Sequence, residues 1–586
     1  MCGIVGIVGL KDASKIDLSR SVSCLSLRGP DDHGVARLNG AVLGHTRLSI
    51  VDLSDAGHQP MKDSASPRTI VFNGEIFNYQ TLKAELEKLG HSFASHSDTE
   101  VILKAYSEWG EACVERLDGQ FAFAIWDEQE QKLFLARDRF GEKPLYVARV
   151  GDTFLFASEI KAILETGLIK PELDHVSLDN YLALLYVPPW RSIYKNITPV
   201  KPAHTAVWQN GRYEEKRYWQ LTREPLSLSF DEAAARVREM LMASVRSRMI
   251  ADVEVGAFLS GGIDSGLVVR LAQEMSDKKL KTFSAGFEDM INELPYAREI
   301  AELAGTEHTE AHIKVDLVET FKKVSAYFDE PFGDSSNVPT NLISNLARKK
   351  VKVALSGDGG DELFWGYGQY TRFDHLPKLE TLYNALFNKN PFDYYRSFML
   401  SVFTPSERKR LLKDASAIEA DPTSHVDYSA AETPLEKINL TDFYMGLPGE
   451  MLTKVDRASM GESLEVRSPF LNHELAQFAY NLPPAYKTDG RRSKIILEKA
   501  FTDLMPQGFF TRKKQGFGAP VYEWLNKPEF KKYTNEIFSG DTYLSRFLNI
   551  AIVKQYFERL HNGDRSVRFK AWSLLALEEW LKSHTI

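Results

Sequence analysis

The sequence is poor in cysteine and has no long apolar run. Its three thiols, Cys2, Cys24 and Cys113, cannot form a disulfide framework and show no metal-ligand spacing, so a reducing compartment is expected. No apolar stretch approaches the roughly 20 residues that a membrane-spanning helix needs. The opening MCGIVGIVGL lacks the basic segment and the cleavage site of a signal peptide. We therefore expect a cytoplasmic protein without a membrane partner.

The chain also lacks a strong excess of charge. It carries 72 Lys and Arg against 80 Asp and Glu, which gives a net charge of −8 over 586 residues. This balance argues against nucleic acid as the main partner. The length exceeds what one hydrophobic core usually supports, so at least two domains are expected.

Short β-like runs dominate residues 1–215, where the clearest helix is Gln80–Leu89. This pattern predicts stacked, mostly antiparallel sheets. The runs expected as strands are Gly3–Val8, Ala41–Leu43, Thr69–Phe72, Phe121–Trp126, Lys132–Arg137 and Thr153–Ala157. A polar linker is expected at 216–228, before a second domain at 229–586.

Strands alternate with helices in the first part of the second domain. Val253–Leu259 is expected as a buried strand that leads through a Gly-rich turn into a helix, and Lys281–Phe287 and Val351–Leu355 as further strands. Such alternation predicts a parallel sheet with ligands at the carboxyl ends of its strands. Beyond about residue 370 the pattern is mainly helical.

Cysteine at position 2 is the first candidate catalytic residue. Removal of Met1 would leave Cys2 at the N-terminus, where an α-amino group with a pKa of about 8 can take the thiol proton. The thiolate could then attack a carboxamide. A cysteine near a chain end is more often incidental, so the motifs that follow it carry the interpretation.

Seven short motifs follow one another through the first half of the chain. They are C-G-I-V-G-I (2–7), R-G-P-D (28–31), H-T-R-L-S-I-V-D (45–52), F-N-G-E-I-F-N-Y (72–79), S-D-T-E (97–100), D-G-Q-F-A-F (118–123) and A-R-D-R-F-G-E-K-P-L-Y (136–146). Together they resemble the class II, N-terminal-nucleophile glutamine amidotransferases. The resemblance implies an α+β domain built as an αββα sandwich, glutamine as substrate, and Cys2 as nucleophile.

Glutamine hydrolysis requires groups that hold the free α-amino and α-carboxylate groups of the substrate. Arg47 can bind the carboxylate bidentately, and Glu75 and Asp98 supply negative charge for the ammonium. Asn73 and the backbone N–H of Gly74 can form an oxyanion hole, where glycine permits close approach. The resemblance places the same roles on these positions. It adds four residues to the lining of the pocket, namely Leu48, Ser49, Ile50 and Val51.

A Ser/Gly-rich turn, S-G-G-I-D-S (260–265), lies between an apolar strand and a helix in the second half. Its glycines let the backbone fold tightly around phosphates, and the helix offers its N-terminal N–H groups to an anion. No Walker A pattern is present. The turn resembles the PP-loop of ATP pyrophosphatases, which cleave between the α- and β-phosphates and transfer AMP.

Three later segments extend the resemblance to the synthetase domain of glutamine-hydrolysing asparagine synthetases. They are S-G-D-G-G-D-E (356–362), K-V-D-R-A-S-M…S-L-E-V-R-S-P-F-L (454–471) and R-K-K-Q-G-F-G (512–518). By this resemblance Asp264 and Asp361 coordinate Mg²⁺, a cation that prefers oxygen ligands. Asp358 would assist formation of an acyl-adenylate, and Lys514 would stabilise phosphate charge. The residues expected to contact ATP are Leu259, Ser260, Gly261, Gly262, Asp264, Ser265, Ala285, Ser356 and Gly357.

The two domains together predict a glutamine-dependent ligase. Adenylation makes a carboxylate oxygen a good leaving group, and ammonia from glutamine then attacks the adenylate. Ammonia passed through an apolar channel between the domains would avoid protonation. The first hypothesis is an asparagine synthetase, which turns ATP, L-aspartate and L-glutamine into L-asparagine, L-glutamate, AMP and pyrophosphate through β-aspartyl-AMP.

Several alternatives stay open at this stage. Relatives of this architecture amidate sugar acids or peptide carboxylates, so the acceptor can be another acid. Two of the departures from the commonest asparagine synthetase pattern are Asn472, where F-L-D-H is usual, and Gly360, which replaces a frequent Ser. A catalytically silent scaffold is a remote alternative, which the intact Cys2 and Asp264 oppose. The sequence also leaves a homodimer open.

Overall fold

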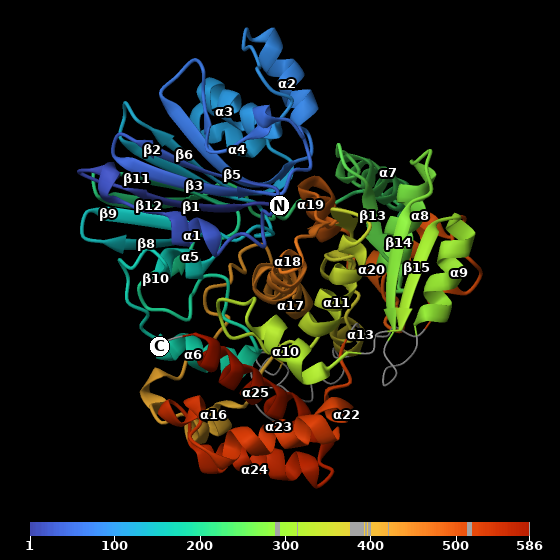
Figure 1. The fold of residues 1–586 in the computed structure, drawn as a ribbon. Helices are drawn as coiled ribbons and strands as arrows, with labels where there is room; N and C mark the ends of the chain where they lie inside the picture. The colour runs from blue at the N-terminus through green and yellow to red at the C-terminus, as the bar shows by residue number, and fades with distance from the viewer. Residues whose placement is uncertain are drawn as a thin grey trace.

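The protein contains two bodies of different construction (Figure 1). A computed structural model describes residues 1–286, 293–312, 315–374, 392, 395, 400–419, 421–512 and 518–584. The first body holds two six-stranded sheets and the second holds a five-stranded parallel sheet. Within the described residues, no helix combines the length and apolarity needed to cross a membrane.

The first sheet has the strand order β10-β8-β9-β1-β3-β2 and is antiparallel throughout. Its strands are β1 (Gly3–Val8), β2 (Asp32–Leu38), β3 (Ala41–Arg47), β8 (Tyr146–Val150), β9 (Thr153–Ala157) and β10 (Ile197–Pro199). Strand β1 is buried along its whole length between β3 and β9. The nucleophile candidate Cys2 therefore directly precedes a central strand that is buried throughout.

The second sheet has the order β12-β11-β7-β6-β5-β4 and is also antiparallel. Its strands are β4 (Met61–Lys62), β5 (Arg68–Ile76), β6 (Gly119–Asp127), β7 (Lys132–Arg137), β11 (His204–Gln209) and β12 (Arg212–Arg217). Strand β12 ends two residues inside the segment expected as a linker, 216–228.

The two sheets pack face to face through an apolar layer that includes Ile4, Val71 and Phe156. Helices α2 (Tyr79–Lys88) and α3 (Asp98–Trp109) pack on the second sheet, and α1 (Ser19–Ser23) and α5 (Ile160–Leu164) on the first. This gives helix, sheet, sheet and helix layers. Helix α3 was not predicted. Its first nine residues are buried, including the polar side chains of Asp98, Glu100 and Lys104.

The parallel sheet of the second body has the order β15-β14-β13-β16-β17. Its strands are β13 (Val255–Phe258), β14 (Lys281–Gly286), β15 (Glu307–His312), β16 (Val353–Leu355) and β17 (Glu465–Arg467). The parallel sheet was predicted, but β17 was not, because the region beyond residue 370 was expected to be helical. Three residues are too few to show a strand period, and two of these three are charged.

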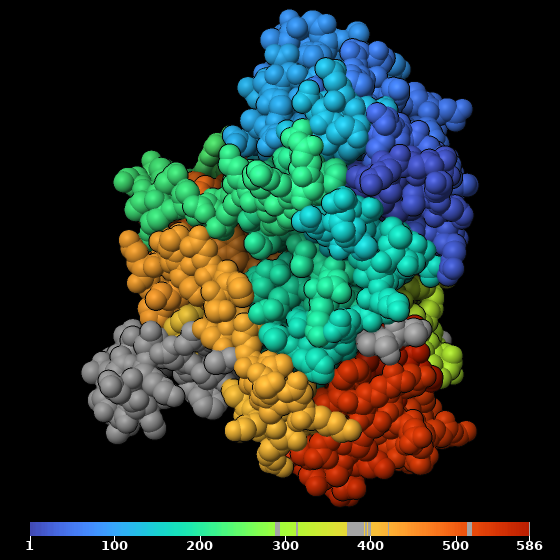
Figure 2. Space-filling model, turned by 90° about the vertical axis from the view of Figure 1, so that its left-hand side faces the viewer, coloured from blue at the N-terminus to red at the C-terminus, as the bar shows by residue number. Residues whose placement is uncertain are grey.

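Helices at the chain end close the base of the molecule, where Figure 2 shows them in red against the blue-green end of the first body. They are α22 (Val521–Leu525), α23 (Pro528–Ser539), α24 (Ile550–His561) and α25 (Arg568–Ser583). Helix α6 (His175–Leu184) of the first half packs into the same core, and Tyr181 donates its hydroxyl to the Ser573 carbonyl oxygen at 2.7 Å. The two halves therefore share one apolar core.

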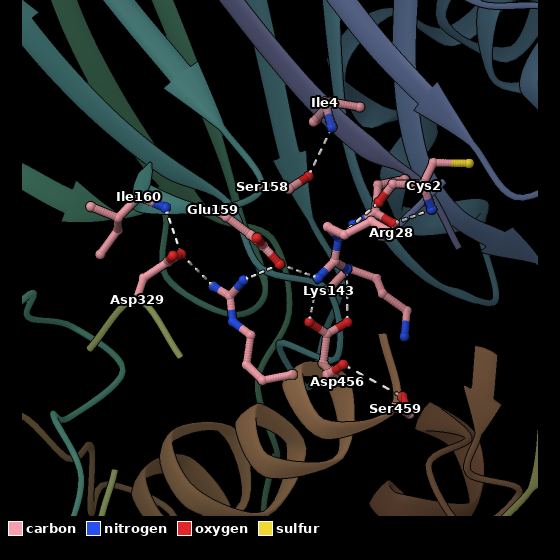
Figure 3. Close-up of polar contacts among 12 residues, drawn as sticks. Cys2, Ile4, Arg28, Lys143, Ser158, Glu159, Ile160, Asp329, Asp456 and Ser459 are labelled. Atoms are coloured by element: carbon pink, nitrogen blue, oxygen red, sulfur yellow. Dashed lines mark hydrogen bonds and ion pairs between the residues drawn. The ribbon is translucent and has the colours of Figure 1, made fainter. Parts of the chain in front are cut away.

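A buried ion-pair network joins the bodies next to Cys2 (Figure 3). Arg28, only 1% exposed, lies 2.8 and 2.9 Å from the two carboxylate oxygens of Asp456 in helix α18 (Thr453–Met460). Its Nη1 also lies 2.9 Å from Glu159, and its Nε donates to the Cys2 carbonyl oxygen at 2.9 Å. Arg28 is therefore a buried ion-pair residue, and one of its partners lies in the other domain.

The run Arg137–Asp138–Arg139 organises loops by hydrogen bonds to the backbone. Arg137 donates to the carbonyl oxygens of Lys143 and Val200 at 2.8 and 2.7 Å. Asp138 accepts the backbone N–H groups of three residues that follow it, Phe140, Glu142 and Lys143. The charge pattern of a sequence does not reveal such acceptors, because every residue offers a carbonyl group.

Replacing Arg28 with methionine is expected to lower stability strongly. The change leaves Asp456 and Glu159 as buried carboxylates that have lost a partner, which costs about 3–5 kcal/mol. Calorimetric melting should show a much lower Tm than for Arg236→Met, the control. Arg236 forms an exposed pair with Glu239 at 2.6 Å, of a kind worth about 0.5 kcal/mol. Equal melting temperatures for the two variants would contradict this account.

Candidate active sites

The thiol of Cys2 is buried at the contact between the two bodies. The backbone N–H of Cys2 donates to Asn73 Oδ1 at 2.9 Å, so strand β5 positions the start of β1. Burial raises the pKa of the Cys2 thiol, although the nearby N-terminal ammonium and a backbone hydrogen bond from Leu48 oppose this. A base is therefore needed to form the thiolate at neutral pH.

The α-amino group lies in the same buried pocket. In the chain that retains Met1, this nitrogen is 3.1 Å from Glu465 Oε2, and Met1 is 1% exposed. Burial lowers the pKa of the ammonium, and Glu465 partly offsets the effect. A lowered pKa leaves more of this amine unprotonated near pH 7, where it can accept a proton.

Asn73 presents one half of its amide to Cys2 and the other half to the pocket. Its Oδ1 is engaged by the Cys2 N–H, and its buried Nδ2 has no hydrogen-bond partner among the described residues. Gly74 has a φ of +152°, and a Cβ there would lie 2.1 Å from the Gln120 carbonyl oxygen. The glycine is required by this close approach, and Nδ2 of Asn73 is a donor that a ligand oxygen can use.

Two buried carboxylates, Glu75 and Asp98, lie close enough to interact electrostatically. Glu75 Oε2 lies 3.0 Å from Arg467, while its Oε1 has no hydrogen-bond partner in the described part of the chain. Burial and then the charge of Asp98 raise the pKa of Glu75 well above its usual range. Asp98 accepts the N–H of Ile76 at 3.0 Å, and burial raises its pKa to about 6. A ligand cation would favour the ionised form of both groups.

Arg47 supports the loop that contains Leu48–Val51. Its guanidinium donates to the carbonyl oxygens of Ser54 at 3.1 Å and Val51 at 3.3 Å. The synthetase body holds the same loop, because Asp252 donates its N–H to Ile50 at 2.9 Å. Asp252 Oδ2 in turn accepts the N–H of Asp52 at 2.8 Å. A ligand carboxylate would compete with these carbonyl groups for Arg47.

The second group of predicted residues meets at the carboxyl ends of β13, β14 and β16. Leu259 follows β13 and leads into the turn 260–265, where the hydroxyl oxygens of Ser260 and Ser265 are 2.9 Å apart. Helix α8 (Ile263–Glu274) begins within this turn. A Cβ on Gly357 would lie 2.8 Å from Asp264 Cβ, so the loops after β13 and β16 are in contact. Ala285 is the penultimate residue of β14.

Asp264 and Asp361 converge on a single cation, the ammonium of Lys494. Its Nζ lies 2.6 and 2.5 Å from the two oxygens of Asp264 and 2.6 Å from Asp361 Oδ1. Burial alone would lower the pKa of Lys494, but the two carboxylates raise it above its usual range. The sequence analysis missed Lys494, because the stretch R-R-S-K-I-I-L (491–497) carries no motif.

A second buried lysine was also missed at this edge of the sheet. Lys454 lies 3.4 Å from Asp334, and its pKa is raised by Asp334, Asp358 and Glu450 against the effect of burial. Burial raises the pKa of Glu450 to about 8. Lys454 opens the motif K-V-D-R-A-S-M, which was the available signal. The predicted Lys514 lies outside the described residues.

Comparison with known proteins identifies the family of both halves. The asparagine synthase family matches residues 236–582, and a glutamine amidotransferase domain matches residues 1–219. The chain belongs to the asparagine synthase family. The prediction of an ATP-dependent carbon–nitrogen ligase that takes its nitrogen from glutamine is thereby confirmed.

Similar proteins cover nearly the whole chain. "Asparagine synthetase [glutamine-hydrolyzing] 1" of Bacillus subtilis (strain 168) is 31% identical and aligns with 99% of this chain and 96% of its own. "Asparagine synthetase [glutamine-hydrolyzing] 3" of the same organism is 34% identical, with 92% and 89% covered. At 29% identity, "Amidase chry2" of Gibberella zeae aligns over 89% and 88% of the two chains.

Two of the departures from the commonest asparagine synthetase pattern, Asn472 and Gly360, have local reasons. Asn472 donates to Asp118 Oδ2 at 3.2 Å and caps helix α19 (His473–Asn481) by accepting the Leu475 N–H at 3.0 Å. An aspartate there would face the Asp118 carboxylate. A Cβ on Gly360 would lie 2.5 Å from Asp264 Oδ1, so the glycine leaves room for this side chain. Neither residue removes a polar group from the candidate sites.

Replacing Gly74 with alanine is expected to damage the glutamine site specifically. The new methyl group must displace the Gln120 carbonyl, and with it Asn73 and Glu75, so glutamate release should fall at least about tenfold, or 1.4 kcal/mol of barrier. The matched control is Gly110→Ala, because Gly110 has a φ of +60° with open space around it. Glutamate release is measured for both variants. Normal hydrolysis by Gly74→Ala would contradict the close approach.

Proposed function

We propose that this enzyme converts L-aspartate into L-asparagine at the synthetase site with ammonia made at Cys2. The observation that carries the proposal is the pairing of two candidate sites across one buried interface. One site combines Cys2 with the Asn73 amide, and the other combines a phosphate-binding turn with Asp264 and Asp361. The full-length similarity to glutamine-hydrolysing asparagine synthetases supports aspartate as the acceptor.

At the first site the chemistry is a thiol attack on an amide. Once Met1 is removed, the amine of Cys2 takes the thiol proton, and the sulfur bonds to the side-chain carbonyl carbon of glutamine. The Asn73 Nδ2 donor stabilises the oxyanion, while Glu75 and Asp98 hold the substrate ammonium and Arg47 its carboxylate. The C–N bond breaks and ammonia leaves. Water then hydrolyses the thioester to glutamate and restores the thiol.

At the second site the chain binds and orients ATP and the acceptor acid. The turn 260–265 and the start of α8 offer backbone N–H groups to the phosphates. Asp264 and Asp361 would hold Mg²⁺, which neutralises phosphate charge, and their convergence on the Lys494 ammonium fits one shared cation. The acceptor carboxylate bonds to the α-phosphorus as pyrophosphate leaves. Ammonia then bonds to the acyl carbon as AMP leaves.

Ammonia must pass between the sites, and the interface offers an apolar contact for this. Leu48 and Ile50 of the glutamine loop share one apolar cluster with Val353 of β16 and Met460 of α18. An apolar route disfavours protonation of ammonia, because ammonium is costly to bury. We therefore place the expected channel along this cluster.

Replacing Cys2 with alanine is expected to separate the two activities. Glutamate release should stop, whereas high ammonium should still support equimolar asparagine, AMP and pyrophosphate from aspartate and Mg-ATP. The matched control is Cys24→Ala, because Cys24 only donates to the Ser21 carbonyl oxygen at 3.1 Å. Products are quantified with aspartate and with a panel of sugar acids. Glutamate release by Cys2→Ala would overturn the nucleophile, and turnover of another acid without aspartate would overturn the acceptor.

Replacing Lys494 with methionine is expected to improve binding of a bare divalent cation. Without the ammonium, Asp264 and Asp361 can both face Mn²⁺, and affinity should rise at least about tenfold, or 1.4 kcal/mol. Calorimetry with Mn²⁺ alone and nucleotide-free protein measures this. Lys499→Met is the control on the same helix, where an exposed pair with Asp231 spans 2.9 Å. Unchanged Mn²⁺ affinity in Lys494→Met would refute competition for the two carboxylates.

A further inference from the structure

The side chain of Arg467 contacts the candidate glutamine pocket from the other domain. Arg467 is the last residue of β17 and is fully buried. Its Nη2 lies 3.0 Å from Glu75 Oε2, and its Nε lies 2.7 Å from Glu465. Its Nη1 donates to the carbonyl oxygens of Arg248 and Ile250 at 2.8 and 2.7 Å. Four partners therefore fix the guanidinium, and one of them belongs to the glutamine pocket.

The backbone of Arg467 contacts the loop after β16, which is expected to bind the nucleotide. The Ser356 N–H donates to the Arg467 carbonyl oxygen at 2.9 Å, directly after the paired residues Leu355 and Arg467. Strands β16 and β17 have three residues each, so this bond is a large part of what holds them in register. A shift of Arg467 would therefore move the first N–H group of the loop that leads to Asp358 and Asp361.

A cation bound beside Glu75 would change the protonation of its carboxylate. Its Oε1 has no hydrogen-bond partner among the described residues, and burial together with Asp98 raises the pKa of the group. A substrate ammonium near Oε1 would favour the ionised carboxylate. An ionised carboxylate attracts a guanidinium by its charge as well as by hydrogen bonding, and a neutral acid lacks that charge. Glutamine would therefore tighten the contact between Glu75 and Arg467.

We propose that Arg467 is a positioning residue that couples the two sites. Glutamine beside Glu75 holds Arg467 in place, and Arg467 then holds the Ser356 N–H in the geometry that the nucleotide uses. The inference rests on the proposed function, since it takes Glu75 as part of the glutamine site and Ser356 as part of the ATP site. Because coupling between two binding equilibria is reciprocal, bound nucleotide must raise glutamine affinity by the same factor.

Equilibrium binding to full-length Cys2→Ala protein tests the coupling, because this protein does not consume glutamine. Calorimetry gives the affinity for glutamine with and without Mg²⁺ and α,β-methylene-ATP, and the affinity for this nucleotide with and without glutamine. Both affinities are expected to rise by one common factor of about five or more. In Cys2→Ala/Arg467→Met the factor is expected to fall to about one, since no side chain then links Glu75 to β17.

Two further variants separate coupling from general damage. Arg217→Met removes another contact between the bodies, a 2.9 Å pair with Asp427, and should keep the parent factor. Arg467→Lys keeps the charge, but an ammonium has three donors for the four bonds that Arg467 makes, so the factor should fall. This variant decides the question if Arg467→Met fails to fold.

Each outcome bears on a different claim. If neither ligand changes the affinity for the other in the Cys2→Ala parent, the coupling is overturned while the proposed function stands. The same holds if the Arg467 variants keep the full affinity change of the parent. Cys2→Ala protein that binds the nucleotide but no glutamine overturns the proposed glutamine pocket, and this inference with it. If Arg217→Met also loses the mutual change in affinity, the coupling comes from domain contact in general, and the role of Arg467 is overturned.

Discussion

One buried arginine fixes the position of the nucleophile relative to both domains. The Arg28 guanidinium contacts Asp456 of the second domain, Glu159 of the first, and the carbonyl oxygen of Cys2. Buried charges cost several kcal/mol each unless partners satisfy them, so the docked interface has to supply a partner for each member of this set. The guanidinium that binds the Cys2 backbone is therefore itself held by a residue of the second domain.

The same arrangement recurs across the interface, where residues proposed to bind glutamine are also interface residues. Glu75 pairs with Arg467, and the loop after Arg47 is held by Asp252. Apolar contacts could also keep the domains together, but they fix no direction, whereas hydrogen-bonded ion pairs fix distance and angle. The consequence is that substrate binding at Cys2 cannot change the charge of Glu75 without acting on the synthetase domain.

The sequence identified residues within motifs but not their partners. Asn73 and Glu75, like Asp264 and Asp361, were predicted together and lie together, because each set sits at strand ends that the fold brings to one edge. Arg467 lay inside a motif, yet its contact with Glu75 spans 392 positions, and no local pattern encodes that distance. Lys494 follows no motif at all. Helix α3 was missed although its sequence mixes polar and apolar residues, and its buried Asp98, Glu100 and Lys104 show that polar residue types do not mark an exposed face.

The two sites hold their carboxylates in opposite electrostatic states. Glu75 and Asp98 have raised pKa values, so an arriving ammonium removes part of a desolvation cost that the free protein carries. Asp264 and Asp361 already share the Lys494 ammonium, so an arriving cation must displace that ammonium. A bare divalent cation brings no new partner for the displaced Lys494 ammonium. A cation that is bound to a triphosphate brings one, because the phosphate oxygens can accept hydrogen bonds from Lys494 when it leaves the carboxylates. The geometry therefore favours binding of metal and nucleotide together over binding of either one alone.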